Sequence, residues 1–108
     1  IYCTNSNPTL SFITISSNNA FCDEGDGRGG GIFCENNSNL QISNVQIESN
    51  TALYQGGGIY CNSSNPSLVN VTITNNSATD ENYSEGGGIY CENSSLSLVN
   101  SILWNDTP

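Results

Sequence analysis

Five cysteines are the residues of this 108-residue chain best suited to metal binding or redox chemistry. Four of them end an Ile-aromatic-Cys triplet and recur every 27 to 31 residues: Cys3, Cys34, Cys61 and Cys91. A zinc site is poorly supported, because the spacing never forms Cys-x-x-Cys and the chain contains no histidine. We therefore expect a column of free thiols that pack as small hydrophobic side chains.

The fifth cysteine, Cys22, lies in a loop whose length varies between repeats, and it makes the number of cysteines odd. Three states are compatible with the sequence: a free thiol, a bond to another copy of the chain, or a bond to one of the recurring cysteines. The recurring cysteines should point the same way on neighbouring strands, so a disulfide between two of them would require distortion.

Glycine triplets precede the last three recurring cysteines, at 29–31, 56–58 and 86–88. A phosphate-binding loop of the P-loop type would need a lysine and a following helix, and the chain has no lysine. We interpret the triplets as corners, where glycine allows a positive φ and lets neighbouring segments approach closely.

Two acidic loops are the candidate metal site, because clustered carboxylates are typical calcium ligands. The residues concerned are Asp23, Glu24 and Asp26 in the first loop and Asp80, Glu81 and Glu85 in the second. Neither loop has the spacing of an EF-hand, and the alternative is a pair of solvated loops that keep the protein soluble. No cofactor other than calcium is suggested.

The formal net charge of −9, with Arg28 as the single basic residue, excludes several classes of partner. One arginine cannot neutralise a row of phosphates, so we expect neither nucleic-acid binding nor attraction to an anionic membrane. No apolar run has the length of a membrane span. General acid–base catalysis is also disfavoured, because His and Lys are missing and most acidic residues lie in loops or near turns. We expect a protein that is not an enzyme.

The elements that position these residues are short alternating strands such as 67–74 (SLVNVTIT), and nothing has helical periodicity. Self-similarity at this period indicates a solenoid. The sequence predicts one all-β segment over 1–108, a parallel β-helix of about four coils at 1–31, 32–58, 59–88 and 89–108. The Ile and Cys of each triplet would point inward and stack on their equivalents to form a continuous core.

This arrangement predicts two further kinds of column, one of aromatic side chains and one of asparagines. The aromatic residue of each triplet would face outward, so that a column is formed by Tyr2, Phe33, Tyr60 and Tyr90. This column either stacks on sugars or simply covers the sheet. Asparagines form a column at Asn44, Asn70 and Asn100 and a second at Asn18, Asn50 and Asn76. Stacked amides can hydrogen-bond along such columns and hold the bends between strands.

The repeated hexapeptide Gly-Gly-Gly-Ile-Tyr-Cys, followed by Ser-Leu-x-Asn-x-x-Ile and Asn-x-Ala, resembles the repeat of secreted bacterial right-handed parallel β-helix proteins, which are pectate-lyase-like in fold. The GGAI and FxxN repeats of chlamydial polymorphic outer membrane proteins are similar. The closing segment 101–108 (SILWNDTP) resembles one found near the end of such arrays. The resemblance covers the whole chain. It implies a right-handed solenoid in an exported, surface-associated protein, and it says little about activity, because one fold hosts many functions.

Two functions from different classes fit these features. The first is an extracellular structural solenoid, a stalk, surface layer or filament, whose unpaired ends stack on further coils or on further copies of the chain. The second is an adhesin that recognises a glycan or a host protein through the outward aromatic column or the acidic loops.

Overall fold

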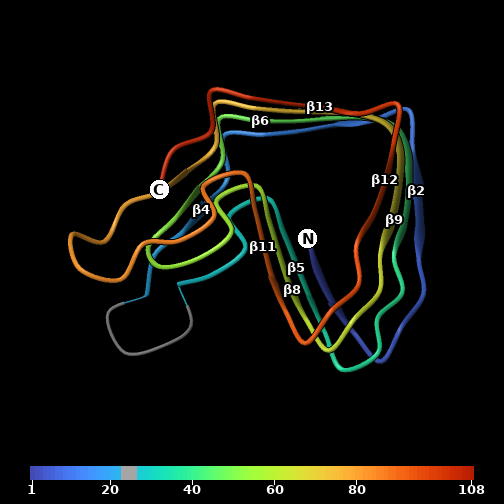
Figure 1. Ribbon diagram of the computed structural model, residues 1–108, viewed down its shortest axis with the longest axis horizontal. Helices are drawn as coiled ribbons and strands as arrows, with labels where there is room; N and C mark the ends of the chain where they lie inside the picture. The colour runs from blue at the N-terminus through green and yellow to red at the C-terminus, as the bar shows by residue number, and fades with distance from the viewer. Residues whose placement is uncertain (23–26) are drawn as a thin grey trace.

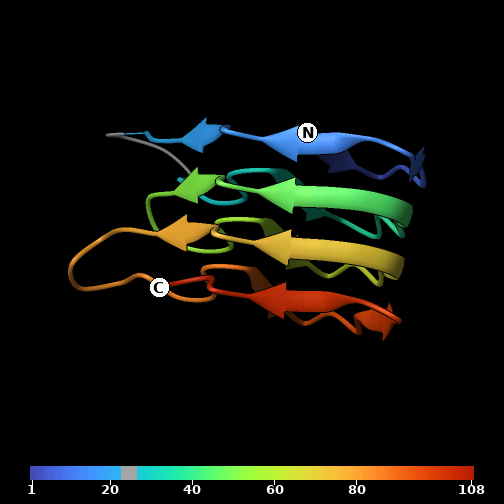
Figure 2. The same cartoon turned by 90° about the horizontal axis from the view of Figure 1, so that it is seen from above.

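The structure is a computed structural model that describes residues 1–22 and 27–108, and every regular element within them is a β-strand (Figure 1). Asp23, Glu24 and Asp26 of the first acidic loop lie outside the described residues. Successive passes of the chain stack in tiers (Figure 2), and all strand pairs are parallel. The predicted parallel β-helix is confirmed. No helix in the described part of the chain has the length and apolar character that crossing a bilayer requires.

Three sheets form the walls of the solenoid. The first contains, in spatial order, β1 (Tyr2–Thr4), β5 (Ile32–Glu35), β8 (Ile59–Asn62) and β11 (Ile89–Glu92). The second contains β2 (Thr9–Ser11), β6 (Gln41–Glu48), β9 (Ser67–Thr74) and β12 (Ser97–Val99), with β3 (Thr14–Ser16) also pairing with β6 and β13 (Ile102–Trp104) with β9. The third contains β4 (Asn19–Ala20), β7 (Thr51–Ala52) and β10 (Ser77–Ala78).

The chain makes three complete turns and a fourth pass that is reduced in the third sheet. The fourth pass supplies β11, β12 and β13 to the first two sheets, but it meets the third only through an isolated bridge between Ser77 and Thr107. The molecule measures 32 × 28 × 19 Å. Four tiers at the usual strand spacing of about 4.8 Å account for the shortest dimension, which is therefore the solenoid axis.

A corner divides the long strands of the second sheet. In β9, Leu68 and Val71 are both buried, although strict alternation would place them on opposite faces. The residue between them that breaks the alternation is Asn70, whose φ of 55° is left-handed. Asn44 and Asn100 have the same conformation at equivalent positions. The corner explains how one strand can contribute inward side chains to two walls of the core.

Glycine is required where the triplets form a second corner. Gly56 has a φ of 65°, a backbone angle that residues other than glycine and asparagine rarely adopt. At Gly57, an added Cβ would lie 2.3 Å from the Ser77 carbonyl oxygen and 2.4 Å from that of Gly87. Both oxygens belong to neighbouring segments of backbone, so the triplets allow successive coils to approach closely.

The core consists of columns of equivalent residues. Ile32 pairs with Ile59 and Ile42 with Leu68, and all four side chains are at most 1 % exposed. The predicted inward position of the triplet isoleucine is therefore confirmed at Ile32 and Ile59. Each coil buries its apolar side chains only against the next one, as expected of a solenoid.

Candidate functional site

The outward aromatic residues form a continuous stack on the first sheet. Ring centroids lie 5.4 Å apart for Tyr2 and Phe33, 4.8 Å for Phe33 and Tyr60, and 5.7 Å for Tyr60 and Tyr90. The planes of the last pair are nearly parallel, at 3°. These distances are typical of offset aromatic stacking, so the faces of the inner rings are covered by their neighbours.

Polar groups further cover this aromatic column. The Arg28 guanidinium carbon lies 5.4 Å from the centroid of Tyr60, close enough for a cation–π contact, and Tyr60 is only 1 % exposed. The Tyr60 hydroxyl donates to Glu92, and the Tyr2 hydroxyl donates to Glu35. A sugar could therefore stack on a ring face only at an end of the column, where Tyr2 is 64 % exposed. Tyr60 faces outward as predicted, but its burial was not foreseen.

A hollow of about 350 Å³ lies beside the column and is lined by Arg28, Tyr54, Gln55 and Tyr83. Gln55 donates to the Glu85 carboxylate at 2.9 Å and forms β-bridges with Arg28 and Glu85. Aromatic walls with one basic side chain are compatible with an anionic small ligand.

The four recurring cysteines form the predicted inward column. Cys3 pairs in register with Cys34, Cys34 with Cys61, and Cys61 with Cys91. Cys34 and Cys61 are fully buried, and Cys91 is exposed at the last tier. All five cysteines, Cys22 included, are free thiols in the structure, and Cys22 is exposed.

Hydrogen bonds between the thiols polarise this column. The bonds that Cys61 makes with Cys34 and Cys91, together with its burial, raise the pKa of the Cys61 thiol well above the ordinary value. The same hydrogen bonds lower the pKa of Cys34 and of Cys91, against the opposing effect of burial. Burial and the neighbouring Cys34 raise the pKa of Cys3. Cys34 and Cys91 are therefore easier to deprotonate than Cys61, which lies between them.

The second predicted asparagine column forms a buried ladder. Asn18 Nδ2 donates to Asn50 Oδ1 at 2.9 Å, Asn50 Nδ2 to Asn76 Oδ1 at 3.0 Å, and Asn76 Nδ2 to Asp106 Oδ1 at 2.9 Å. Each acceptor oxygen also receives the backbone N–H of the preceding member. Asn50 and Asn76 are completely buried. This ladder ties the tiers together at the end of the second sheet.

The column of Asn44, Asn70 and Asn100 has a different role from the ladder. These side chains are exposed, and one amide contact is found, from Asn70 Nδ2 to Asn44 Oδ1 at 3.4 Å. Their contribution is the left-handed backbone of the corner. Phe12 adopts the same conformation, with a φ of 55° and 80 % of its side chain exposed.

A serine ladder was not identified from the sequence. Ser38 and Ser64 are completely buried, and their hydroxyls accept the backbone N–H of Ser6 and Ser38 respectively. Ser94 accepts that of Ser64 in the same way. The recurrence of a serine three to four residues after each cysteine was the signal that could have predicted it.

The described residues of the second acidic loop do not converge. Asp80 Oδ1 accepts the backbone N–H groups of Asn82 and Tyr83, both at 2.9 Å, so it closes a turn. Glu85 is bonded to Gln55, and Glu81 is exposed. Within the described part of the chain, no three His, Cys, Asp or Glu side chains are grouped in a way that could hold a metal ion.

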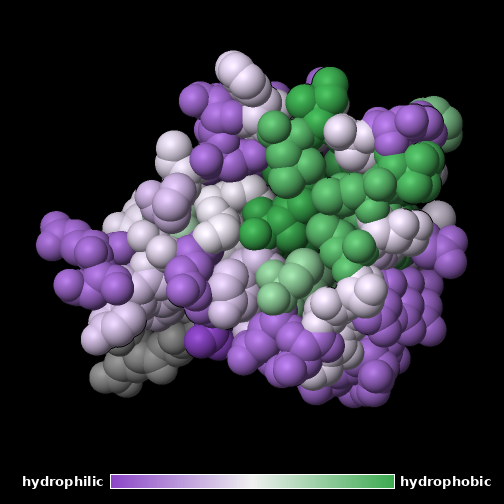
Figure 3. All heavy atoms as spheres, viewed as in Figure 1, coloured by the Kyte–Doolittle hydropathy of each residue, from purple (hydrophilic) through white to green (hydrophobic). Residues whose placement is uncertain are grey.

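The C-terminal end of the core is open. Leu98 and Leu103 pair in register with the fully buried Leu68 and Ile73, yet they are 42 % and 45 % exposed. Figure 3 shows hydrophobic atoms gathered over this end. The corresponding side chains of the first tier are better covered, since Ile15 is 6 % exposed.

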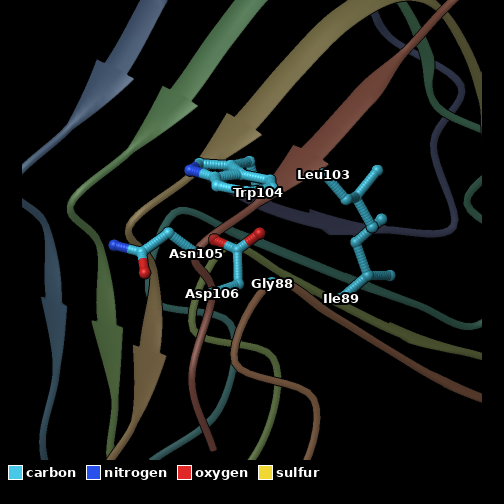
Figure 4. A pocket seen from close by; sticks show the side chains of 6 residues that line it. All are labelled: Gly88, Ile89, Leu103, Trp104, Asn105 and Asp106. Atoms are coloured by element: carbon cyan, nitrogen blue, oxygen red, sulfur yellow. The ribbon is translucent and has the colours of Figure 1, made fainter.

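A shallow depression lies within this open end (Figure 4). Its lining comprises Gly88, Ile89, Leu103, Trp104, Asn105 and Asp106. Asp106 Oδ2 is buried and has no hydrogen-bond partner, in contrast to Oδ1. The end thus combines exposed core side chains with an incomplete hydrogen-bond ladder.

Residues 1–107 match the family described as the right handed beta helix region. Neither a curated protein nor a solved structure matches the chain. The match spans the described tiers and their sheets, and it agrees with the parallel register of every strand pair. The chain belongs to the right-handed β-helix family.

Proposed function

We propose that this chain is a non-catalytic structural solenoid that extends by stacking its open C-terminal end on the first tier of a second copy. The observation that carries the proposal is the exposure of Leu98 and Leu103, which occupy core positions but lack a covering tier. A surface, stalk or filament outside the cell is the setting that fits such a rod.

The first tier of the chain has the same kinds of side chain as the tier that would cover the open C-terminal end. Ile1, Tyr2 and Cys3 repeat the triplet with which the last tier begins, at residues 89–91. Within the chain, the same triplet already stacks in register, as Cys61 on Cys91 shows. A head-to-tail contact would therefore continue the aromatic, thiol and aliphatic columns, and a contact of this kind that does not close generates a filament.

The test compares two substitutions on one strand. Leu103 points into the core, and its neighbour Ile102 points outward with 59 % exposure. We expect Leu103→Asp to abolish concentration-dependent association in sedimentation velocity, because it places a charge in the contact. Ile102→Asp is the matched control and should associate like the unaltered chain. Equal behaviour of the two variants, or a monomer at every concentration, would refute head-to-tail stacking.

Glycan binding is the second candidate, and the hollow beside Arg28 is the observation that favours it. An acidic sugar would suit the single basic side chain and the walls formed by Tyr54 and Tyr83. A glycan array compares the unaltered chain with Tyr83→Ala. Binding that this substitution removes would support the adhesin alternative, and an array without hits would argue against it.

Calcium is not needed for the proposed structural role. Asp80 and Glu85 are held by protein donors, so we expect chelation to leave the melting temperature unchanged. The measurement is a thermal melt with and without chelator. A calcium-dependent rise in melting temperature that Asp80→Asn abolishes would instead establish the site expected at the acidic loops.

A further inference from the structure

The two buried ladders run in the same direction along the solenoid axis. In the asparagine ladder, the backbone N–H of Asn50 donates to Oδ1 of Asn76 in the next tier at 3.0 Å. In the serine ladder, the backbone N–H of Ser38 donates to Oγ of Ser64 in the next tier at 3.1 Å. In both ladders, each tier therefore presents a donor to the tier that follows it and an acceptor to the tier that precedes it.

The last tier presents the donors of both ladders at the open C-terminal end. Asp106 Oδ1 accepts the backbone N–H of Asn76 at 2.8 Å, and Ser94 Oγ accepts that of Ser64 at 3.0 Å. The backbone N–H groups of Asp106 and Ser94 hold the donor positions of the two ladders, but no further tier follows in the described chain to accept them. A partner that covers this end must supply two acceptors, because a buried N–H group without one is unfavourable.

The first tier presents the matching acceptors at the opposite end. Asn18 donates through its backbone N–H and through Nδ2 to Asn50 Oδ1, as Asn50 does to Asn76 Oδ1. Its own Oδ1 therefore lies on the side where the other members of the ladder receive a backbone N–H. Ser6 donates its backbone N–H to Ser38 Oγ and holds the equivalent place in the serine ladder. Both Asn18 and Ser6 are exposed.

This arrangement decides which ends of two copies can meet. Where the C-terminal end of one copy covers the first tier of another, each ladder donor meets an acceptor and the parallel register of the sheets continues. Two first tiers in contact would oppose acceptor to acceptor, and two C-terminal ends would oppose donor to donor. Polar groups buried in this way have no partner, so both symmetric contacts are disfavoured.

A third ladder runs in the opposite direction, but it lies on the surface. The backbone N–H groups of Asn39 and Asn65 donate to the Oδ1 atoms of Asn7 and Asn39 respectively. All three residues are exposed. Solvent can satisfy the ends of this ladder, so it adds no comparable preference for one partner end.

We propose that Asn18 and Ser6 select the partner end, by accepting the backbone N–H groups of Asp106 and Ser94 of the preceding copy. This inference rests on the proposed stacking and adds its polarity, its register and the side chains that enforce both. The aliphatic contact at Leu103 cannot do so alone, because hydrophobic attraction has no direction. The resulting contact is heterologous, and neither end pairs with its own kind.

Sedimentation velocity measures the contribution of the two acceptors. Asn18→Ala and Ser6→Ala each leave one donor of the preceding copy unpaired, which should weaken association about tenfold. The double variant should associate about a hundredfold more weakly, because the two residues belong to separate ladders. Asn19→Ala, at an exposed neighbouring position on β4, is the matched control and should associate like the unaltered chain. Circular dichroism verifies that each variant is folded.

A mixture of two blocked variants tests the polarity. Ile1→Asp places a charge on the first tier at a position that is 49 % exposed, and Leu103→Asp places one on the open C-terminal end. Each variant should be a monomer alone. An equimolar mixture should form a dimer with one copy of each and nothing larger, because one intact end of each kind remains.

Three results would overturn the proposal while leaving stacking itself intact. They are self-association of either blocked variant, a mixture that stays monomeric although the unaltered chain associates, and equal association constants for Asn18→Ala and Asn19→Ala. A monomer of the unaltered chain at every concentration would refute the stacking and this inference with it.

Discussion

The side-chain amide of Asn76 donates to Asp106 Oδ1 at 2.9 Å, so the buried asparagine ladder ends in a carboxylate. Asn76 Nδ2 also donates to the backbone carbonyl of Ile47, which lies in the preceding tier, at 3.0 Å. At Asp106 the corresponding atom is Oδ2, an acceptor that is buried without a partner. The repeat is therefore chemically incomplete at the point where a further tier would be added.

Asp106→Asn should complete the ladder. The new Nδ2 would face the Ile73 carbonyl, as the amides of Asn50 and Asn76 face their equivalents. Satisfying a buried group of this kind contributes about 1 kcal/mol, so the free energy of unfolding in urea should rise by roughly that amount. Head-to-tail association should also strengthen. Unchanged or lower stability would show that the orphaned oxygen is not a defect of the ladder.

Asn50→Ala and Asn44→Gly separate the two asparagine columns. Asn50 donates to two acceptors and receives two N–H groups in the interior. Its loss should lower the free energy of unfolding by about 2 to 4 kcal/mol, because several buried groups lose their partners. Asn44 makes one long contact, and glycine accepts its φ of 54°, so Asn44→Gly should have little effect. Equal effects of the two changes in urea denaturation would contradict these separate roles.

Gly57→Ala tests the close approach of the coils. The added methyl group would lie within 2.5 Å of two backbone carbonyl oxygens that cannot move independently of their tiers. Overpacking commonly costs 1 to 3 kcal/mol, and we expect a loss of at least about 3 kcal/mol here because the clash is with backbone. Thr79→Ala, at an exposed position, is the control. A melting temperature equal to that of the unaltered chain would rule out this role of the triplet.

Much of the fold could be predicted from the sequence because each inward residue stacks on its own equivalent. The recurrence of Ile59 and Cys61 in every tier encodes both the register and the inward face. The asparagine roles could not be read in the same way. Asn70 breaks the alternation of its strand, so a pattern of period two cannot tell a corner asparagine from a ladder asparagine.

The aromatic column shows a second limit of sequence reasoning. Alternation correctly places Tyr60 on the outer side of the first sheet, but exposure depends on what lies over that side. Its neighbours Phe33 and Tyr90 cover its faces and Arg28 lies over its ring, although Arg28 precedes Tyr60 by a whole turn of the solenoid. Contacts between tiers of this kind have no local signal in the sequence.

The reactivity of Cys91 should depend on its buried neighbour. Because the Cys61 thiol donates to it, the pKa of Cys91 is lowered, and its thiolate forms at a lower pH than that of an ordinary cysteine. In a Cys22→Ser background, the midpoint of the pH dependence of alkylation should rise in Cys61→Ala, which removes the donor. Cys61→Ser keeps a donor and should stay closer to the parent. A midpoint that is the same in all three proteins would exclude the hydrogen bond as the cause.

Electron microscopy of the purified protein at high concentration distinguishes end-to-end stacks from single molecules. The structural solenoid should appear as rods that lengthen with concentration and have an axial repeat of about 19 Å, the height of four stacked tiers. Leu103→Asp should yield single particles. Monodisperse single particles of the unaltered chain at every concentration would refute head-to-tail stacking.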